Sequence, residues 1–113
     1  MLVELDDGIR KYIQDKMSSV DSNVYNETEF NIFFSLPHRI FANINPHGII
    51  IAFCTLRTLD NGYQMCYSWC NGTREGKKAY LKGIHSMIED YGPISFAAGA
   101  LKLNIIRRLT DAY

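Results

Sequence analysis

The chain has 113 residues, of which 47% are hydrophobic and 21% are charged. This composition is typical of a globular protein and excludes a disordered chain, and the length predicts a single domain over residues 1–113. Twelve Lys and Arg residues balance twelve Asp and Glu residues, so bulk attraction to nucleic acid or to an anionic membrane is not expected.

The charges are unevenly distributed along the chain. Residues 1–73 hold five basic and eight acidic side chains, a net charge of −3, whereas residues 74–113 hold seven and four, a net charge of +3. The apolar run 49–54 is far too short to span a membrane, and acidic residues stand near the N-terminus where a signal peptide carries basic ones. The three cysteines lack CxxC spacing, which argues against a disulfide framework. A cytoplasmic protein is therefore expected.

The first predicted element is a helix. Asp6 and Asp7 are candidate caps, and the helix is expected to end near Ser19. Five apolar residues recur at the three-and-four spacing of one buried helical face: Ile9, Tyr12, Ile13, Met17 and Val20. The polar residues that follow predict a loop.

A series of strands is predicted next. The stretch 29–36 is strand-like, and 39–44 resumes the pairing after Pro37. The run 49–56 is continuously apolar and rich in β-branched residues, which predicts a central strand covered on both faces.

The dipeptide Asn61-Gly62 predicts a hairpin that leads into a strand over 63–70. Side chains alternate along a strand, so one face is expected to carry Tyr63, Met65, Tyr67 and Trp69. This aromatic face could stack a ligand or nucleic-acid bases, but packing under a helix is the more common role of such a face.

A basic, glycine-containing turn over 72–76 connects this strand to a second helix, which Gly92-Pro93 ends. A short strand over 94–98 and a final helix over 100–113 follow. The strand-helix-strand crossover is expected to make its two strands parallel. The predicted fold class is α+β, with an N-terminal helix, a mostly antiparallel sheet of four to five strands, and then helix, strand and helix.

The basic turn is the main candidate site. Free backbone N–H groups and the helix dipole make a helix N-terminus suitable for anions, and Arg74, Lys77 and Lys78 add positive charge. A solvated turn is the alternative, because neither a Walker motif nor GxGxxG is present. His38, His47 and His85 fall in three different elements without metal-ligand spacing, so no metal site is predicted.

This element order, with a basic glycine-containing turn after a strand, resembles the Gcn5-related N-acetyltransferase (GNAT) fold over about residues 29–113. In that family the turn carries an Arg/Gln-x-x-Gly-x-Gly/Ala signature whose amides hold the pyrophosphate of acetyl-CoA. The resemblance implies that acetyl-CoA, if the chain binds it, contacts Cys70, Asn71, Arg74, Gly76, Lys77, Lys78 and Ala79.

The sequence departs from this signature in either register. With Arg74 in the first position, Lys77 stands where glycine belongs; with Thr73 first, Gly76 fits but Lys78 ends the motif. A side chain at the glycine position crowds the approach of a phosphate to the backbone, which should weaken cofactor binding.

The family's catalytic positions are also altered. Active members have an asparagine at the start of the last segment and a tyrosine two turns later as general acid, whereas Gly99 and Ile106 occupy these positions here. No catalytic residue is therefore predicted. The chain ends at Tyr113, where the family usually continues with a final hairpin. It resembles a trimmed, catalytically silent acetyltransferase-like domain of the kind found among small bacteriophage proteins.

Two functions from different classes follow. The first is a non-enzymatic binding or inhibitor protein that engages a larger protein through its basic face or an exposed strand edge, without a cofactor. The alternative is an acetyl-CoA-dependent N-acetyltransferase that uses the 71–79 turn and polarises the thioester with a backbone N–H near Cys70 or Asn71. A homodimer is a further expectation, since the absent hairpin would leave a sheet edge open.

Overall fold

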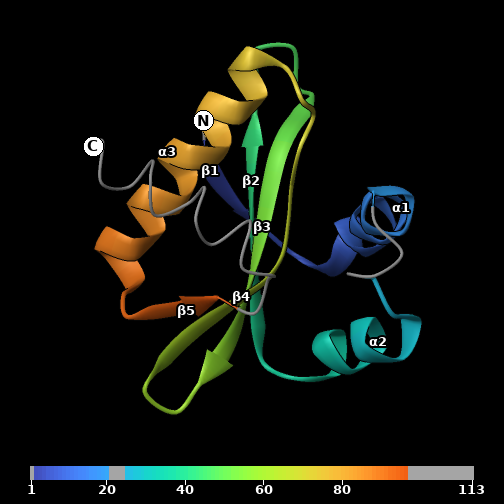
Figure 1. Ribbon diagram of the computed structural model, residues 1–113, viewed down its shortest axis with the longest axis vertical. Coiled ribbons are helices and arrows are strands. Elements are labelled where there is room, and N and C mark those ends of the chain that lie inside the picture. Colours follow the sequence, from blue (N-terminus) through green and yellow to red (C-terminus); the bar gives the residue numbers. More distant parts are fainter. Residues whose placement is uncertain (1, 21–24, 97–113) are drawn as a thin grey trace.

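The computed structural model describes residues 2–20 and 25–96 of the chain. A five-stranded sheet forms the middle layer, with helices α1 and α2 on one face and helix α3 on the other (Figure 1). The elements in chain order are β1 (Leu2–Leu5), the short 3-10 helix η1 (Asp7–Ile9), α1 (Arg10–Val20), α2 (Glu27–Ser35), β2 (His38–Ile44), β3 (Ile50–Leu59), β4 (Gly62–Cys70), α3 (Arg74–Tyr91) and β5 (Ile94–Phe96).

The sheet order is β1-β2-β3-β4-β5, with antiparallel pairing between all neighbours except β4 and β5, which are parallel. The predicted α+β class, the central place of β3 and the parallel crossover are thereby confirmed. The predicted final helix, 100–113, lies outside the described residues.

The N-terminal helix begins where its caps were predicted. Asp6 is the N-cap of η1, and its carboxylate accepts a hydrogen bond from the N–H of Gly8 at 2.8 Å. Strand β1, which precedes it, was not predicted from the sequence. Four residues are too few to establish a period, and β1 is defined by its pairing with β2, from Leu2 opposite Asn43 to Leu5 opposite Ile40.

The segment 29–36 is not a strand, as predicted, but lies mostly within helix α2. Asn26 caps this helix, because its side-chain oxygen accepts a hydrogen bond from the N–H of Glu29 at 3.0 Å. Ile32 is 52% exposed, whereas three aromatic residues at helical spacing are buried against the sheet: Phe30, Phe33 and Phe34. The prediction was wrong because aromatic and β-branched residues favour strands locally, and tertiary packing overrides that weak preference here.

The predicted hairpin between β3 and β4 is present, but its turn lies one residue earlier than expected. Leu59 pairs with Gly62, so Asp60 and Asn61 are the turn residues, and neither has a positive φ. Gly62 has a φ of 153°, and a Cβ there would come within 2.7 Å of the Pro93 carbonyl oxygen. Glycine is required here by this close approach and by its φ, and not as the second residue of a type I′ turn.

A β-bulge interrupts β4. The register with β3 shifts between Cys54 and Leu56, so Thr55 lies opposite both Cys66 and Tyr67. The Thr55 hydroxyl closes the gap, since it accepts a hydrogen bond from the Tyr67 N–H at 2.8 Å and donates one to the Tyr67 carbonyl at 3.2 Å. Thr55 is fully buried, so the Tyr67 N–H and carbonyl at the bulge have their hydrogen-bond partner without water.

The bulge overturns the prediction that one face of β4 carries Tyr63, Met65, Tyr67 and Trp69. Tyr63 and Met65 belong to the core under α3, whereas Tyr67 and Trp69 pack on the opposite face, with α1 and α2. One extra residue moves every later side chain to the other face of a strand, because side chains alternate with a period of two.

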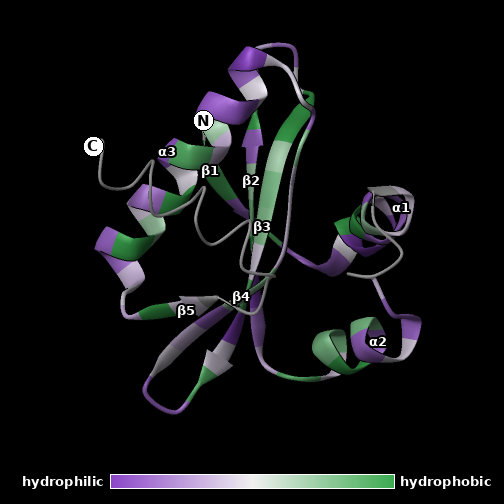
Figure 2. Cartoon of the chain, in the orientation of Figure 1, coloured by the Kyte–Doolittle hydropathy of each residue, from purple (hydrophilic) through white to green (hydrophobic). Residues whose placement is uncertain are grey.

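Two hydrophobic cores result, one on each face of the sheet. Hydrophobic residues lie along β3 in the middle of the sheet, and they alternate with hydrophilic ones along α3 (Figure 2). The core between the sheet and α1 and α2 consists of Ile13, Met17, Phe30, Phe33, Phe34, Ile40, Ala42, Phe53 and Tyr67. The core under α3 consists of Phe41, Cys54, Leu56, Met65, Ile84 and Met87.

Candidate functional site

The candidate turn between β4 and α3 is short. Only residues 71–73 separate the two elements, and Gly72 adopts a φ of 80° that lets the chain reverse its direction. The N–H of Asn71 donates a hydrogen bond to the Ile51 carbonyl at 3.0 Å, which ties the turn to the start of β3. The position of the turn relative to the sheet is therefore fixed by backbone contacts.

The side chains of the turn cap the first turn of α3. Thr73 is the N-cap, and its hydroxyl oxygen accepts a hydrogen bond from the Gly76 N–H at 2.9 Å. The side-chain oxygen of Asn71 accepts from both the Thr73 N–H, at 3.1 Å, and the Thr73 hydroxyl, at 2.6 Å. The Lys77 N–H donates to the Thr73 carbonyl at 2.9 Å. Three of the amides near this helix N-terminus, those of Thr73, Gly76 and Lys77, are thus bound by the chain itself.

Gly76 is needed for this arrangement. A Cβ at this position would overlap the side-chain oxygen of Asn71 and come within 3.1 Å of the Ile51 carbonyl oxygen. Gly76 is buried, so its role in the structure is the close contact between α3, the turn and β3. Close approach of a phosphate is the other role that the resemblance implied for it.

The residues predicted to hold a cofactor lie around this turn. Cys70 is the last residue of β4, and Asn71 lies in the connection. The other five lie in the first two turns of α3, and they are Arg74, Gly76, Lys77, Lys78 and Ala79. Beyond the first turn of a helix each N–H bonds the carbonyl four residues earlier, so the amides of Lys78 and Ala79 are used within α3. Binding of a cofactor by these residues stays a prediction.

Thr73 has a role that the sequence analysis missed. The signature makes Thr73 only a poor match to its first position, whereas the structure shows that Thr73 caps α3. A threonine three residues before the glycine of a predicted helix start is a usual N-cap signal, and this signal could have identified it.

The two amides predicted to polarise a thioester differ in their surroundings. The Asn71 N–H already donates to Ile51, so it is occupied. Antiparallel pairs alternate between hydrogen-bonded and non-hydrogen-bonded, so at the next pair, Ala52 and Cys70, the Cys70 N–H is directed away from β3. On that side, the described part of β5 pairs only with residues 63–65 of β4.

Beneath the turn, Ser68 and Tyr80 form a hydrogen bond of 2.8 Å between their hydroxyl groups. Burial raises the pKa of Tyr80 to about 12, and the hydrogen bond with Ser68 opposes this shift. Tyr80 therefore stays neutral at physiological pH. It can exchange a hydrogen bond with a neighbour, but it is a poor base.

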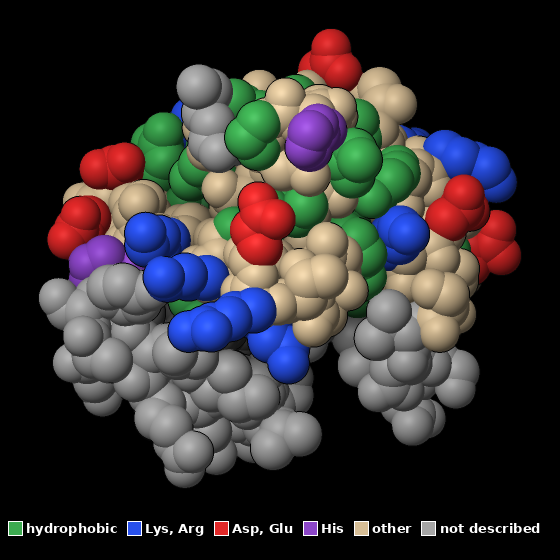
Figure 3. Space-filling view, turned by 90° about the horizontal axis from the view of Figure 1, so that it is seen from above, with side chains coloured by type: hydrophobic (Ala, Val, Ile, Leu, Met, Phe, Trp, Pro, Cys, Tyr) green, Lys and Arg blue, Asp and Glu red, His purple; other side chains and the backbone are tan. Residues whose placement is uncertain are grey.

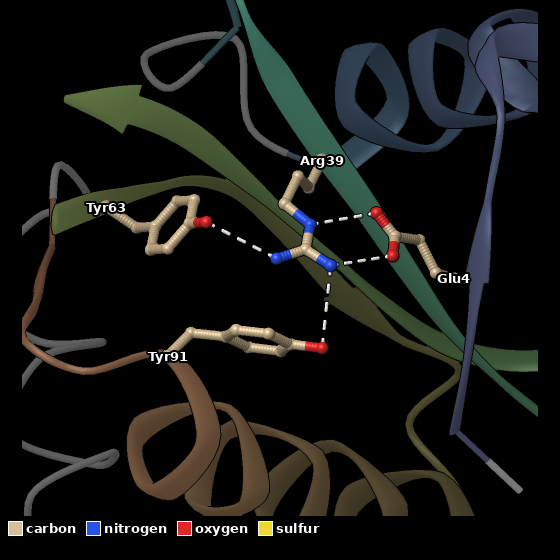
Figure 4. Close-up of polar contacts among 4 residues, drawn as sticks. All are labelled: Glu4, Arg39, Tyr63 and Tyr91. Atoms are coloured by element: carbon tan, nitrogen blue, oxygen red, sulfur yellow. Dashed lines mark hydrogen bonds and ion pairs between the residues drawn. The ribbon is translucent and has the colours of Figure 1, made fainter.

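A second polar cluster centres on Arg39 of β2 (Figure 4). Its guanidinium donates to both carboxylate oxygens of Glu4, at 2.8 and 2.9 Å, and to the hydroxyls of Tyr63 and Tyr91 at 3.3 and 3.5 Å. It also lies 4.3 Å from the ring centroid of Tyr91. The hydrogen bond from Arg39 lowers the pKa of Glu4. This cluster joins β1, β2, β4 and α3, and its contacts are those of a structural ion pair.

Within residues 2–20 and 25–96 no group of three or more His, Cys, Asp or Glu side chains is arranged to hold a metal ion. No helix among the described residues is long and apolar enough to cross a membrane. The positions of Gly99 and Ile106, where the resemblance placed altered catalytic residues, lie outside the described part of the chain.

Comparison with known proteins supports the fold. No protein-family model matches the sequence, and no curated protein matches it. Among solved structures the chain is similar to a protein described as "Putative acetyl transferase from Pyrococcus furiosus", with a TM-score of 0.56 over 95% of this chain and 91% of that one. Only 14% of the residues are identical, so the likeness shows the fold alone. Together with the element order, it shows that the chain has a GNAT-like fold and thus an acetyltransferase-like core.

Proposed function

We propose that the chain is a non-enzymatic binding protein in which the acetyltransferase-like core engages a larger protein partner. One observation carries this proposal: the chain's own side chains occupy the start of α3. Thr73 binds the Gly76 amide, and Asn71 holds Thr73 in place. By the resemblance to the GNAT signature, the amides of this turn are those that an enzyme of the family would present to a pyrophosphate, so their internal hydrogen bonds support a role without the cofactor.

The electrostatics of the turn support the same reading. A phosphate at this helix start would compete with the Thr73 hydroxyl for the Gly76 N–H and with the Asn71 side-chain oxygen for the Thr73 O–H. Glu75, an exposed carboxylate in the first turn, already complements the helix dipole and would repel an anion. Among the amides of this first turn, those of Arg74 and Glu75 are left for a ligand, since Thr73 binds those of Gly76 and Lys77.

The alternative is an acetyl-CoA-dependent N-acetyltransferase, and two observations favour it. The solved structure that resembles this chain is described as an acetyl transferase. In addition, the Cys70 amide is directed to the side of β4 away from β3, where an N–H could polarise a thioester carbonyl. In this reading Arg74, Lys77 and Lys78 would hold the pyrophosphate.

A thermal-unfolding titration with CoA and acetyl-CoA separates the two functions. The binding-protein proposal expects no shift of the melting temperature with either ligand. A ligand at a hundredfold excess over its Kd would stabilise the fold by about 2.7 kcal/mol, so a saturable shift of this size would overturn the proposal. If such a shift occurs and the double variant Arg74→Ala/Lys77→Ala abolishes it, the acetyltransferase function gains the support instead.

The partner is tested by native mass spectrometry. The tagged full chain, purified gently from the cells in which it naturally acts, is expected to carry one protein in a fixed stoichiometry. Recovery of the chain alone, or with bound CoA, would count against the proposal. Thr73→Ala is the control variant. It removes the cap of α3 at a cost of about 1 kcal/mol in stability and leaves the rest of the exposed surface unchanged, so it is expected to keep the partner.

A further inference from the structure

The loop between β2 and β3 presents an exposed apolar side chain on a fixed backbone. Ile49 is 58% exposed. The side-chain oxygen of Asn45 accepts hydrogen bonds from the N–H groups of His47, at 2.9 Å, and of Ile49, at 3.0 Å. The Asn45 N–H donates to the Ile49 carbonyl at 2.9 Å. Both the N–H and the carbonyl of Ile49 are bonded to Asn45, so the backbone that carries this exposed side chain is held in one place.

Helix α3 carries an exposed row of cations, which we call the basic stripe: Arg74, Lys77, Lys78 and Lys82. Their spacing of three and four residues places them along one side of the helix over about 12 Å. None of the four forms an ion pair with another described residue, whereas Lys11 and Arg39 pair with Asp15 and Glu4 elsewhere in that part of the chain. Glu75 is the one carboxylate between Arg74 and Lys82, so the stripe keeps a net positive charge.

The backbone segments that carry the two features lie close together. The Asn71 N–H bonds the Ile51 carbonyl, and Gly76 lies close to the same oxygen. The start of β3 therefore sits against the first turn of α3, and Ile49 precedes Ile51 by two residues. Hydrophobic side chains and a group of Lys and Arg side chains share one face of the molecule when it is seen from above (Figure 3).

We propose that Ile49 and the basic stripe together bind an acidic segment of the protein partner, one that carries an apolar side chain among its carboxylates. This inference rests on the proposed protein-binding function and names the surface and the chemistry of the partner. Charge complementarity gives the cations a role in steering and orienting the segment. The preorganised Ile49 offers an apolar anchor at little cost in conformational entropy.

A nucleic acid fits this surface less well. The chain has no net charge, and Glu75 interrupts the row of cations. Binding to nucleic acid draws mainly on many phosphate contacts, to which an isoleucine adds nothing. An acidic protein segment uses both the cations and the exposed isoleucine, and so accounts for the two features together.

Fluorescence anisotropy with the full chain tests the inference. The probe is a fluorescein-labelled glutamate-rich peptide with one central leucine; a second peptide has serine in place of the leucine, and a single-stranded DNA of equal charge is the third ligand. The double variant Arg74→Glu/Lys78→Glu is expected to weaken binding of the leucine peptide about tenfold or more. Ile49→Ser is expected to remove the preference for leucine over serine.

A matched control is Lys11→Glu/Arg57→Glu, which changes the net charge equally at exposed positions on α1 and β3. It is expected to alter affinity less than about twofold at physiological ionic strength, where distant charges are screened. Equal losses in the two double variants would overturn the inference, as would DNA binding as tight as that of the leucine peptide, or no binding of either peptide.

The inference and the proposed function fail in different ways. A native complex with a protein partner that survives Arg74→Glu/Lys78→Glu would leave the binding function standing and refute this surface. A saturable shift of the melting temperature with acetyl-CoA would refute the binding function, regardless of whether the peptides bind.

Discussion

Arg39→Ala is expected to lower the free energy of unfolding by about 2 kcal/mol, about half of it from the lost ion pair with Glu4 and half from lost stacking. The ion pair is bidentate, with contacts of 2.8 and 2.9 Å, but the Glu4 side chain is 45% exposed and solvent screens it. The guanidinium also lies 4.3 Å from the Tyr91 ring centroid. The bonds to the tyrosine hydroxyls, at 3.3 and 3.5 Å, are long and add little.

Urea unfolding followed by the fluorescence of Trp69, the single tryptophan, measures this loss. Lys11→Ala is the matched control, because its pair with Asp15 is 3.6 Å long and both side chains are more than 60% exposed. The control is expected to stay within about 0.5 kcal/mol of the parent protein. A double-mutant cycle of Arg39→Ala with Glu4→Gln is expected to give a coupling energy of about 1 kcal/mol.

The dependence on pH gives an independent check. The hydrogen bond from Arg39 holds the pKa of Glu4 below its ordinary value of 4.5. A carboxylate with a lowered pKa stabilises the folded state fully above its unfolded pKa, and this contribution is lost as the pH falls through the folded pKa. The difference in stability between the parent protein and Glu4→Gln should therefore shrink below about pH 4.5. A cost of Arg39→Ala equal to that of Lys11→Ala, or a coupling energy of zero, would refute the reasoning.

Three further predictions concern the cores. Phe30→Ala is expected to cost about 4 kcal/mol in urea unfolding, because it opens a cavity at a fully buried site, whereas Ile32→Ala on the exposed side of the same helix should cost less than about 0.5 kcal/mol. Thr55→Val is expected to cost about 2 kcal/mol, because the Tyr67 N–H loses its buried partner at the bulge; an equal cost for Thr55→Ser would contradict this role. In a spectrophotometric titration, Tyr80 is expected to ionise near pH 12 while the fold persists. Since its pKa is raised on folding, stability should fall as the pH rises above the ordinary value of 10.0, and Tyr80→Phe should reduce that fall.

The elements with a long, clear period were predictable from the sequence. α3 combines an 18-residue amphipathic pattern with a stop at Gly92, and β3 is an apolar run of strand length. Asp6 marked the N-terminal helix start through its capping side chain. In each case the signal is local, because the residues that decide the conformation lie within a turn or two of one another.

The elements that were missed depend on contacts between distant residues. β1 exists as a strand because β2 pairs with it, and the aromatic residues of α2 read as strand-like until the sheet buries them on one helical side. The bulge in β4 depends on the Thr55 hydroxyl, which replaces a backbone partner for Tyr67. No local sequence pattern predicts any of these features.

For the candidate site, the sequence determined the place and the charge: a basic turn between a strand and a helix, with a glycine at 76 and cations around it. The tertiary structure decided how the turn is used. The register of β3 beside β4 brings the Ile51 carbonyl against Gly76, and the capping bonds of Asn71 and Thr73 use amides that the sequence had left open to a phosphate. The sequence shows which hydrogen-bond donors and acceptors a turn contains. Only the fold shows which of them already have a partner within the chain, because hydrogen-bond partners are set by geometry in three dimensions.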